Sequence, residues 1–261
     1  DWLAHHRSLG VAGVLAMDFG STDGSVDILT SERWASFVTM TDFPGITPNH
    51  SRILIGVARG IWPVGWALMI DPDEFLFTRT GSIDDPELHG AMSAAPAIVI
   101  PRYEMTARRS IAGPLADAPQ AVDLTLRGTG RDQGKVLIDL TSQVRPSRST
   151  HLARGSTPLD LGGSGVSLLH APVRTFARFD QKVRHAEFTL QESPFLGPDH
   201  AWHWRRWIRI RDEGRLAAEY LDQFVDDDAL AATLESGEIV VDHRLADAIR
   251  GARARIHGAP W

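Results

Sequence analysis

The chain has 261 residues, of which 43% are hydrophobic and 23% are charged, and its net charge is −6 at pH 7. This length fits one large domain or a domain with an appendage, and the composition is that of a folded protein with a sizeable core. The acidic balance argues against a general nucleic-acid binder, because phosphate affinity comes from clustered lysine and arginine. The absence of cysteine excludes disulfides and thiolate metal sites and fits a reducing compartment.

No apolar run approaches the roughly 20 residues of a membrane-spanning helix, and no signal peptide is expected at the start of the chain. Asp1 stands within what reads as a helix already under way, so we expect the natural sequence to begin upstream of it. The expected location is the cytoplasm, either free or at the inner face of the membrane.

The first hundred residues alternate helical stretches with short apolar strands. Helices are expected at Trp2–Leu9, Val26–Arg33, Pro48–Ile61 and about Pro86–Ser93, and strands at Val11–Met17, Ser36–Met40, Gly65–Ile70 and Ala97–Pro101. The alternation predicts an α/β fold with a Rossmann-like parallel or mixed sheet flanked by helices. Ligands on such sheets bind beyond the carboxyl ends of the strands, and Asp18 and Asp71 are expected at one such rim.

The second half is more broken. Prolines and glycines divide residues 110–165 into loops around one expected strand, Val136–Leu140. A strand at Val166–Leu169 ends at His170, and a helix at Val173–Leu190 follows. Beyond Pro194 comes a cluster of tryptophans among arginines, Trp202, Trp204 and Trp207. Further helical patterns follow at Leu216–Val225, Asp228–Glu235 and Leu245–Arg255. The predicted organisation is a domain at 1–195 and a helical extension at 196–261.

The stretch Asp71-Pro72-Asp73-Glu74 follows the apolar run Trp66–Ile70 and is the most informative motif. Carboxylates this close repel one another unless a cation lies between them, and hard divalent ions prefer oxygen ligands. Glu74 is expected on the opposite face from Asp73, where it would orient neighbours rather than bind metal, and Phe75 and Leu76 are expected in the core. The alternative is an acidic, proline-containing turn without a ligand.

Other polar residues are placed where they could join this motif. The loop after Asp18 is rich in glycine and serine and opens a helix, which suits a nucleotide, although helix capping by Asp23 or Ser25 explains the same residues. His170 with two carboxylates would suit Mn²⁺ or Mg²⁺ when a diphosphate fills the remaining positions. Arg174 and Lys182 stand eight residues apart on one expected helix face, where they could hold phosphate.

Two carboxylates, Glu104 and Asp139, are candidates for the general base that deprotonates an acceptor hydroxyl. His151 is a second candidate histidine, whereas His5 and His6 are expected to be packing or surface residues. The tryptophan cluster could stack on sugar rings or lie at a membrane interface, and helix packing explains it equally well.

Four segments, taken in order, resemble one protein family. Trp2–Val11 is similar to the "EWLaHHralGv" segment of family 2-type glycosyltransferases, and Asp18–Ser25 to their "DNxSxDGT" loop. Trp66–Leu76 resembles their "W…DxDEFL" block, and His170–Lys182 the "HYxxRSxxxFxxK" block of the branch related to family 92. The resemblance covers roughly residues 1–190, and its Asp-x-Asp block is the most specific part.

The resemblance implies a GT-A-like fold, and the first strand of that fold is missing from this sequence. It also implies sugar transfer from a nucleotide-sugar donor, most simply a UDP-sugar, to a glycan or other hydroxyl acceptor in glycan or polysaccharide synthesis, with inversion and with Mn²⁺ or Mg²⁺ as cofactor. By the same likeness the metal ligands are Asp71, Asp73 and His170, and the donor-binding residues are Asp18, Asp71, Asp73, Arg174 and Lys182.

Nucleic acid is not an expected partner, whereas peripheral association with a membrane stays open. Two other functions stay open from the sequence. One is a non-catalytic carbohydrate-binding or assembly module that retains the fold, and the other is a metal-dependent phosphoester hydrolase.

Overall fold

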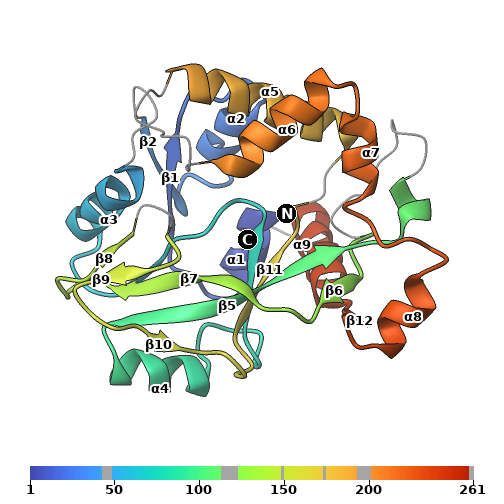
Figure 1. The fold of residues 1–261 in the computed structure, drawn as a ribbon. Coiled ribbons are helices and arrows are strands. Elements are labelled where there is room, and N and C mark those ends of the chain that lie inside the picture. The colour runs from blue at the N-terminus through green and yellow to red at the C-terminus, as the bar shows by residue number, and fades with distance from the viewer. Residues whose placement is uncertain (43–48, 113–122, 148–149, 173–174, 193–200, 259–261) are drawn as a thin grey trace. The chain divides into compact units, whose positions relative to one another are not determined.

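The computed structural model describes residues 1–42, 49–112, 123–147, 150–172, 175–192 and 201–258 (Figure 1). The chain forms two compact units, one made of Asp1–Arg102 with Asp132–Leu168 and the other of Tyr103–Arg131 with Leu169–Trp261. The fold is mixed α/β, as the sequence predicts. The expected helical extension at 196–261 lies within the second unit, together with residues from 103–131 and 169–195.

The first unit contains the acidic motif and most of the strands. Its helices are α1 (Trp2–Ser8), α2 (Ser25–Thr30), α3 (His50–Ile61) and α4 (Pro86–Ala94). Its strands are β1 (Val14–Asp18), β2 (Val38–Asp42), β3 (Trp66–Leu68), β4 (Glu74–Phe77), β7 (Asp132–Asp139), β8 (Arg145–Pro146), β9 (Ala153–Arg154) and β10 (Leu159–Asp160). Two further strands, β5 (Ala97–Thr106) and β11 (Ser167–His170), run from the first unit into the second.

Strand β7 organises the sheet of the first unit. It pairs antiparallel with β3 and with β5, while β10 adds to β5 in parallel (Figure 1). The register of β5 against β7 shifts between Ile100 and Arg102, around Pro101, which has no backbone N–H to donate. Gly134 lies so close to β5 that a Cβ on it would stand 2.2 Å from the carbonyl oxygen of Ile100. Among the described residues most of these strand pairs are antiparallel and some are parallel, so the sheet is the mixed form of the predicted parallel or mixed sheet.

The core of this unit packs α4 against the sheet. Leu88 and Ala91 of α4 contact the same buried cluster as Ile98 and Ile100 of β5 and Leu76 of β4. The pattern follows from the sequence, because α4 is capped by Asp85 and begins at a proline, two signals that start a helix. The prediction that Phe75 and Leu76 enter the core is confirmed, since they are 2% and 4% exposed.

Asp18 and Asp71 do not follow strands of one sheet. Within the described residues β1 pairs with β2 in parallel and these two strands form a sheet of their own, while β3 belongs to the sheet of β7. The prediction of a shared sheet rim is therefore wrong. The two strands are still linked through packing, because Leu15 of β1 and Ala67 of β3 both contact the cluster built from Ile55, Ala58 and Leu140.

Helix α1 holds strand β4 through its side chains. The indole of Trp2 donates a hydrogen bond to the carbonyl oxygen of Glu74 (2.7 Å), and Nε2 of His5 donates to that of Leu76 (2.7 Å). Nε2 of His6 accepts from the backbone N–H of Leu76 (3.3 Å), so its Nδ1 carries the proton and donates to the carbonyl oxygen of Trp2 (2.9 Å). The two histidines are packing residues, and they fix the strand that follows the acidic motif.

The second unit is mainly helical. It contains the short 3₁₀ helix η1 (Arg109–Ala112), β6 (Leu126–Gly128), α5 (Phe176–Glu192), α6 (Trp202–Asp212), α7 (Leu216–Leu221), α8 (Leu230–Glu235), β12 (Ile239–Val241) and α9 (Arg244–Gly258). Strand β6 pairs antiparallel with the end of β5 and with β12. Helices α5, α6 and α7 pack together around Phe179 and Tyr220, which are both buried. Among the described helices, none combines the length and the apolarity needed to cross a membrane.

Burial of His6 makes the stability of the fold depend on pH. Burial lowers the pKa of His6 from 6.5 to about 3, so below pH 6.5 the unfolded chain binds a proton that the folded chain does not bind. This contribution is complete above pH 6.5 and is lost as the pH falls toward 3, at roughly 1 kcal/mol per pH unit. We expect His6→Gln to flatten the change in unfolding free energy between pH 7.5 and 5, measured by urea denaturation. The exposed His89 provides the control His89→Gln, and equal pH slopes in all three proteins would refute the assignment.

Candidate functional site

The acidic motif forms a tight turn between β3 and β4. The backbone N–H of Glu74 donates to the carbonyl oxygen of Asp71 (3.0 Å), and the N–H of Asp71 donates to Oε2 of Glu74 (2.9 Å). Pro72 and Asp73 form the tip of the turn. The side chain of Asp71 is 61% exposed, whereas that of Glu74 is fully buried. The turn therefore presents the carboxylate of Asp71 to solvent and directs that of Glu74 inward.

Two basic side chains compensate the buried carboxylate. Nη1 of Arg102 donates to Oε1 of Glu74 (2.8 Å), and Nζ of Lys135 lies 3.5 Å from Oε2. Arg102 also pairs with Asp132 at the start of β7. A buried charge is tolerated only when it is paired and hydrogen-bonded, so these contacts are what allow Glu74 to lie in the interior. The prediction that Glu74 orients its neighbours is confirmed.

Lys135 also reaches the exposed member of the motif. Its Nζ donates to Oδ2 of Asp71 (2.7 Å) and to the hydroxyl of Thr150 (3.1 Å). Neither Lys135 nor Arg102 was predicted from the sequence as a site residue. The available signal was a charged residue at the head of the apolar run Val136–Leu140.

The carboxylate of Asp18 forms hydrogen bonds within its own loop. Its carboxylate accepts hydrogen bonds from the backbone N–H groups of Gly20 (2.9 Å) and Ser21 (3.1 Å) and from the Ser21 hydroxyl (2.5 Å). The hydroxyl of Ser21 is the main cause that lowers the pKa of Asp18, so the group stays ionised. Gly20 and Gly24 have φ values of 92° and 82°, which favour glycine. Asp18 therefore shapes the loop that is expected to receive the nucleoside.

The N-cap position of α2 is held by neither of the residues predicted for it, Asp23 or Ser25. Gly24 occupies the N-cap position of α2 without a side-chain hydrogen bond, while Oδ1 of Asp23 accepts from the backbone N–H of Ser25 (3.1 Å).

In the second unit, His170 pairs with Glu104. Nδ1 of His170 lies 2.7 Å and 2.9 Å from the two carboxylate oxygens of Glu104, and their side chains are 15% and 43% exposed. Glu104 lies within β5 rather than in a loop, and His170 ends β11. A carboxylate that holds Nδ1–H fixes the tautomer of an imidazole and raises its basicity, as in many metal-binding and acid–base sites.

The expected metal ligands are divided between the units, with Asp71 and Asp73 in the first and His170 in the second. Within the described residues, no three acidic, histidine or cysteine side chains form a group that could hold a metal ion. The convergence of these residues on one cation stays a prediction.

The remaining candidates have varied surroundings. Asp139 ends β7, and its Oδ1 accepts from the backbone N–H and the hydroxyl of Thr141 (both 2.8 Å). Lys182 is exposed on α5, with its Nζ 5.8 Å from the ring centroid of Trp207, and Arg174 lies outside the described residues. Nδ1 of His151 donates to the carbonyl oxygen of Gly134 (2.8 Å), and burial lowers its pKa.

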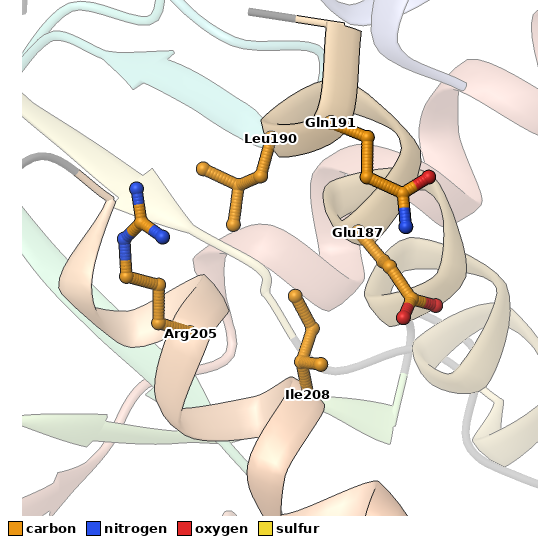
Figure 2. A pocket seen from close by; sticks show the side chains of 5 residues that line it. All are labelled: Glu187, Leu190, Gln191, Arg205 and Ile208. Atoms are coloured by element: carbon orange, nitrogen blue, oxygen red, sulfur yellow. The ribbon is translucent and has the colours of Figure 1, made fainter. Parts of the chain in front are cut away.

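A groove of about 360 Å³ lies between α5 and α6 (Figure 2). Its lining residues are Glu187, Leu190, Gln191, Arg205 and Ile208. Two tryptophans of α6 have different environments. Trp202 is 66% exposed. The ring of Trp207 packs on that of Phe179, with 5.2 Å between their centroids, and its Nε1 donates a hydrogen bond to Oε1 of Glu219 (3.1 Å). Helix packing therefore explains Trp207 but not Trp202.

Comparison of the sequence with models of known protein families finds no match, and a search of curated proteins finds no matching sequence.

Removing the buried charge of Glu74 should destabilise the protein. In Glu74→Gln the shape is kept, but Arg102 and Lys135 lose a carboxylate inside the protein, which costs about 3 kcal/mol when a buried ion pair is broken. Urea denaturation measures the loss. Asp84→Asn, at a side chain that is 88% exposed, is the matched control and should change the unfolding free energy by less than about 0.5 kcal/mol. Equal stability of the two variants would contradict this account.

Proposed function

We propose that the protein is a metal-dependent glycosyltransferase that transfers a sugar, with inversion, from a nucleotide-diphosphate sugar to an acceptor hydroxyl in glycan or polysaccharide synthesis. The observation that carries the proposal is the acidic turn at Asp71–Glu74, together with three motifs that stand in the order of the family 2-type enzymes. The proposed finer fold is GT-A-like. The proposed donor carries UDP.

The rigid support of the turn favours this function. Asp71 is exposed while the residue three positions later is buried in an ion-pair network, and α1 holds the strand that follows. A binding group on a supported turn is held in a defined geometry, which transfer chemistry needs. A turn that served only to reverse the chain would not need a buried network.

The donor set fits a hard divalent cation. Asp71 and Asp73 offer carboxylate oxygens from one turn, which Mn²⁺ and Mg²⁺ accept, and diphosphate oxygens would complete the coordination. In this proposal Asp71, Asp73 and His170 hold the metal, and Asp18, Arg174 and Lys182 bind the donor. A metal bound there would act as a Lewis acid that stabilises the leaving diphosphate.

Glu104 is the better candidate for the general base. Its carboxylate is 43% exposed and pairs with His170, whereas Asp139 accepts the hydrogen bonds that close the turn at Thr141. In a single displacement the acceptor oxygen bonds to the anomeric carbon, the bond to the diphosphate breaks, and the acceptor proton passes to the base. Glu104 would take that proton.

Ligand binding tests the proposal directly. A complex with Mn²⁺ and UDP at 100 times the dissociation constant would stabilise the folded state by about 2.7 kcal/mol and raise the melting temperature by several degrees. We expect Asp73→Asn to abolish this increase and Asp84→Asn to retain it. Transfer from a UDP-sugar, followed as UDP release with an acceptor present, should be lost in Asp73→Asn and retained in Asp84→Asn. No stabilisation by any nucleoside diphosphate would count against the proposal.

A second candidate is a non-catalytic carbohydrate-binding module. The specific observation in its favour is the exposure of Trp202 on α6, the helix that forms one side of the groove in Figure 2. Exposed aromatic rings stack on sugars. Glycan binding that needs no metal and is lost in Trp202→Ala would favour this function over transfer.

A further inference from the structure

The ammonium group of Lys135 is buried next to the acidic turn. Its Nζ lies 2.7 Å from Oδ2 of Asp71, 3.1 Å from the hydroxyl of Thr150 and 3.5 Å from Oε2 of Glu74. The side chain is only 4% exposed, so protein oxygens rather than water compensate its charge. The acidic turn is therefore already in contact with a positively charged side chain from β7.

The charges of this network divide into two pairs. Arg102 makes the shorter contact with Glu74, at 2.8 Å, and so supplies most of the compensation for that buried carboxylate. The shortest contact of Lys135 is with Asp71, the member of the motif whose side chain is 61% exposed. Lys135 therefore acts mainly on the carboxylate that faces solvent.

The residue type at this position fits that role. Of the 27 basic residues, only Lys135 and Lys182 are lysines. An ammonium is a compact point charge with three donors, whereas a guanidinium is a planar fork that needs more room. The three donors of the Lys135 ammonium match the three oxygens around it, those of Asp71, Thr150 and Glu74.

We propose that Lys135 is a positioning residue that makes metal binding at Asp71 depend on the diphosphate. The ammonium holds the Asp71 carboxylate in place and offsets part of its negative charge. A divalent cation arriving alone would share Asp71 with another cation, and their repulsion would weaken its binding. A diphosphate brings the negative charge that removes this penalty. The metal then binds tightly only together with the nucleotide.

This inference rests on the proposed function, because that function supplies the metal and the diphosphate. What it adds is that binding of the metal and binding of the diphosphate depend on each other through Lys135. Lys135→Met removes the ammonium and should leave a stable fold, since Glu74 keeps Arg102 and the exposed Asp71 can be hydrated.

The test measures Mn²⁺ binding to the whole chain by electron paramagnetic resonance, with and without saturating UDP. We expect the wild-type protein to bind Mn²⁺ at least about tenfold more tightly with UDP than without it, as follows from removing a nearby like charge. Lys135→Met should bind Mn²⁺ alone about tenfold more tightly than wild type, so the gain in Mn²⁺ affinity on adding UDP should be about tenfold smaller than in wild type. Arg52→Met removes an exposed positive charge from the same unit and should behave as wild type.

The possible results separate the two proposals. Equal affinity of wild type and Lys135→Met for Mn²⁺ alone, with UDP binding intact, overturns the inference and leaves the proposed function standing. Failure of all the proteins to bind Mn²⁺ with UDP overturns both. Lys135→Gln is the second variant should the methionine protein not fold, and wild-type Mn²⁺ binding that is insensitive to UDP overturns the inference without any variant.

Discussion

The burial of one carboxylate, that of Glu74, constrains the whole acidic turn. A fully buried charge has to be paired, and the pairing brings Arg102 from β5 and Lys135 from β7 to the start of β4. The same requirement leaves Asp71 exposed at the surface of this network. The turn is thus fixed by electrostatics on one side and by the hydrogen bonds from α1 on the other.

This arrangement separates the groups that support the turn from those that face solvent. His5 and His6 form hydrogen bonds with the backbone of β4 and are buried, so the double histidine has a structural explanation. Asp18 likewise shapes its loop through hydrogen bonds from Gly20 and Ser21. Such preorganisation is what the proposed glycosyltransferase would need, because binding groups held in position lose little entropy when a donor arrives.

The second unit contains a carboxylate–imidazole pair, Glu104 and His170. Glu104 and His170 come from β5 and β11, the two strands that run between the units. Together they combine a carboxylate with an imidazole of defined tautomer, which suits proton transfer as well as metal binding. For this reason Glu104 is the proposed base.

The sequence by itself determined the local elements and the residue types of the site. Apolar periodicity and helix end signals placed the helices near α1, α3 and α4, and side-chain alternation along an extended segment predicted an orienting role for Glu74, which its buried ion pairs fit. Only the tertiary structure decided that β1 and β3 belong to different sheets and that Lys135 lies against Asp71. The physical reason is that strand pairing and ion pairing join residues far apart in the chain, 64 positions in the case of Lys135 and Asp71, and no local pattern records such contacts.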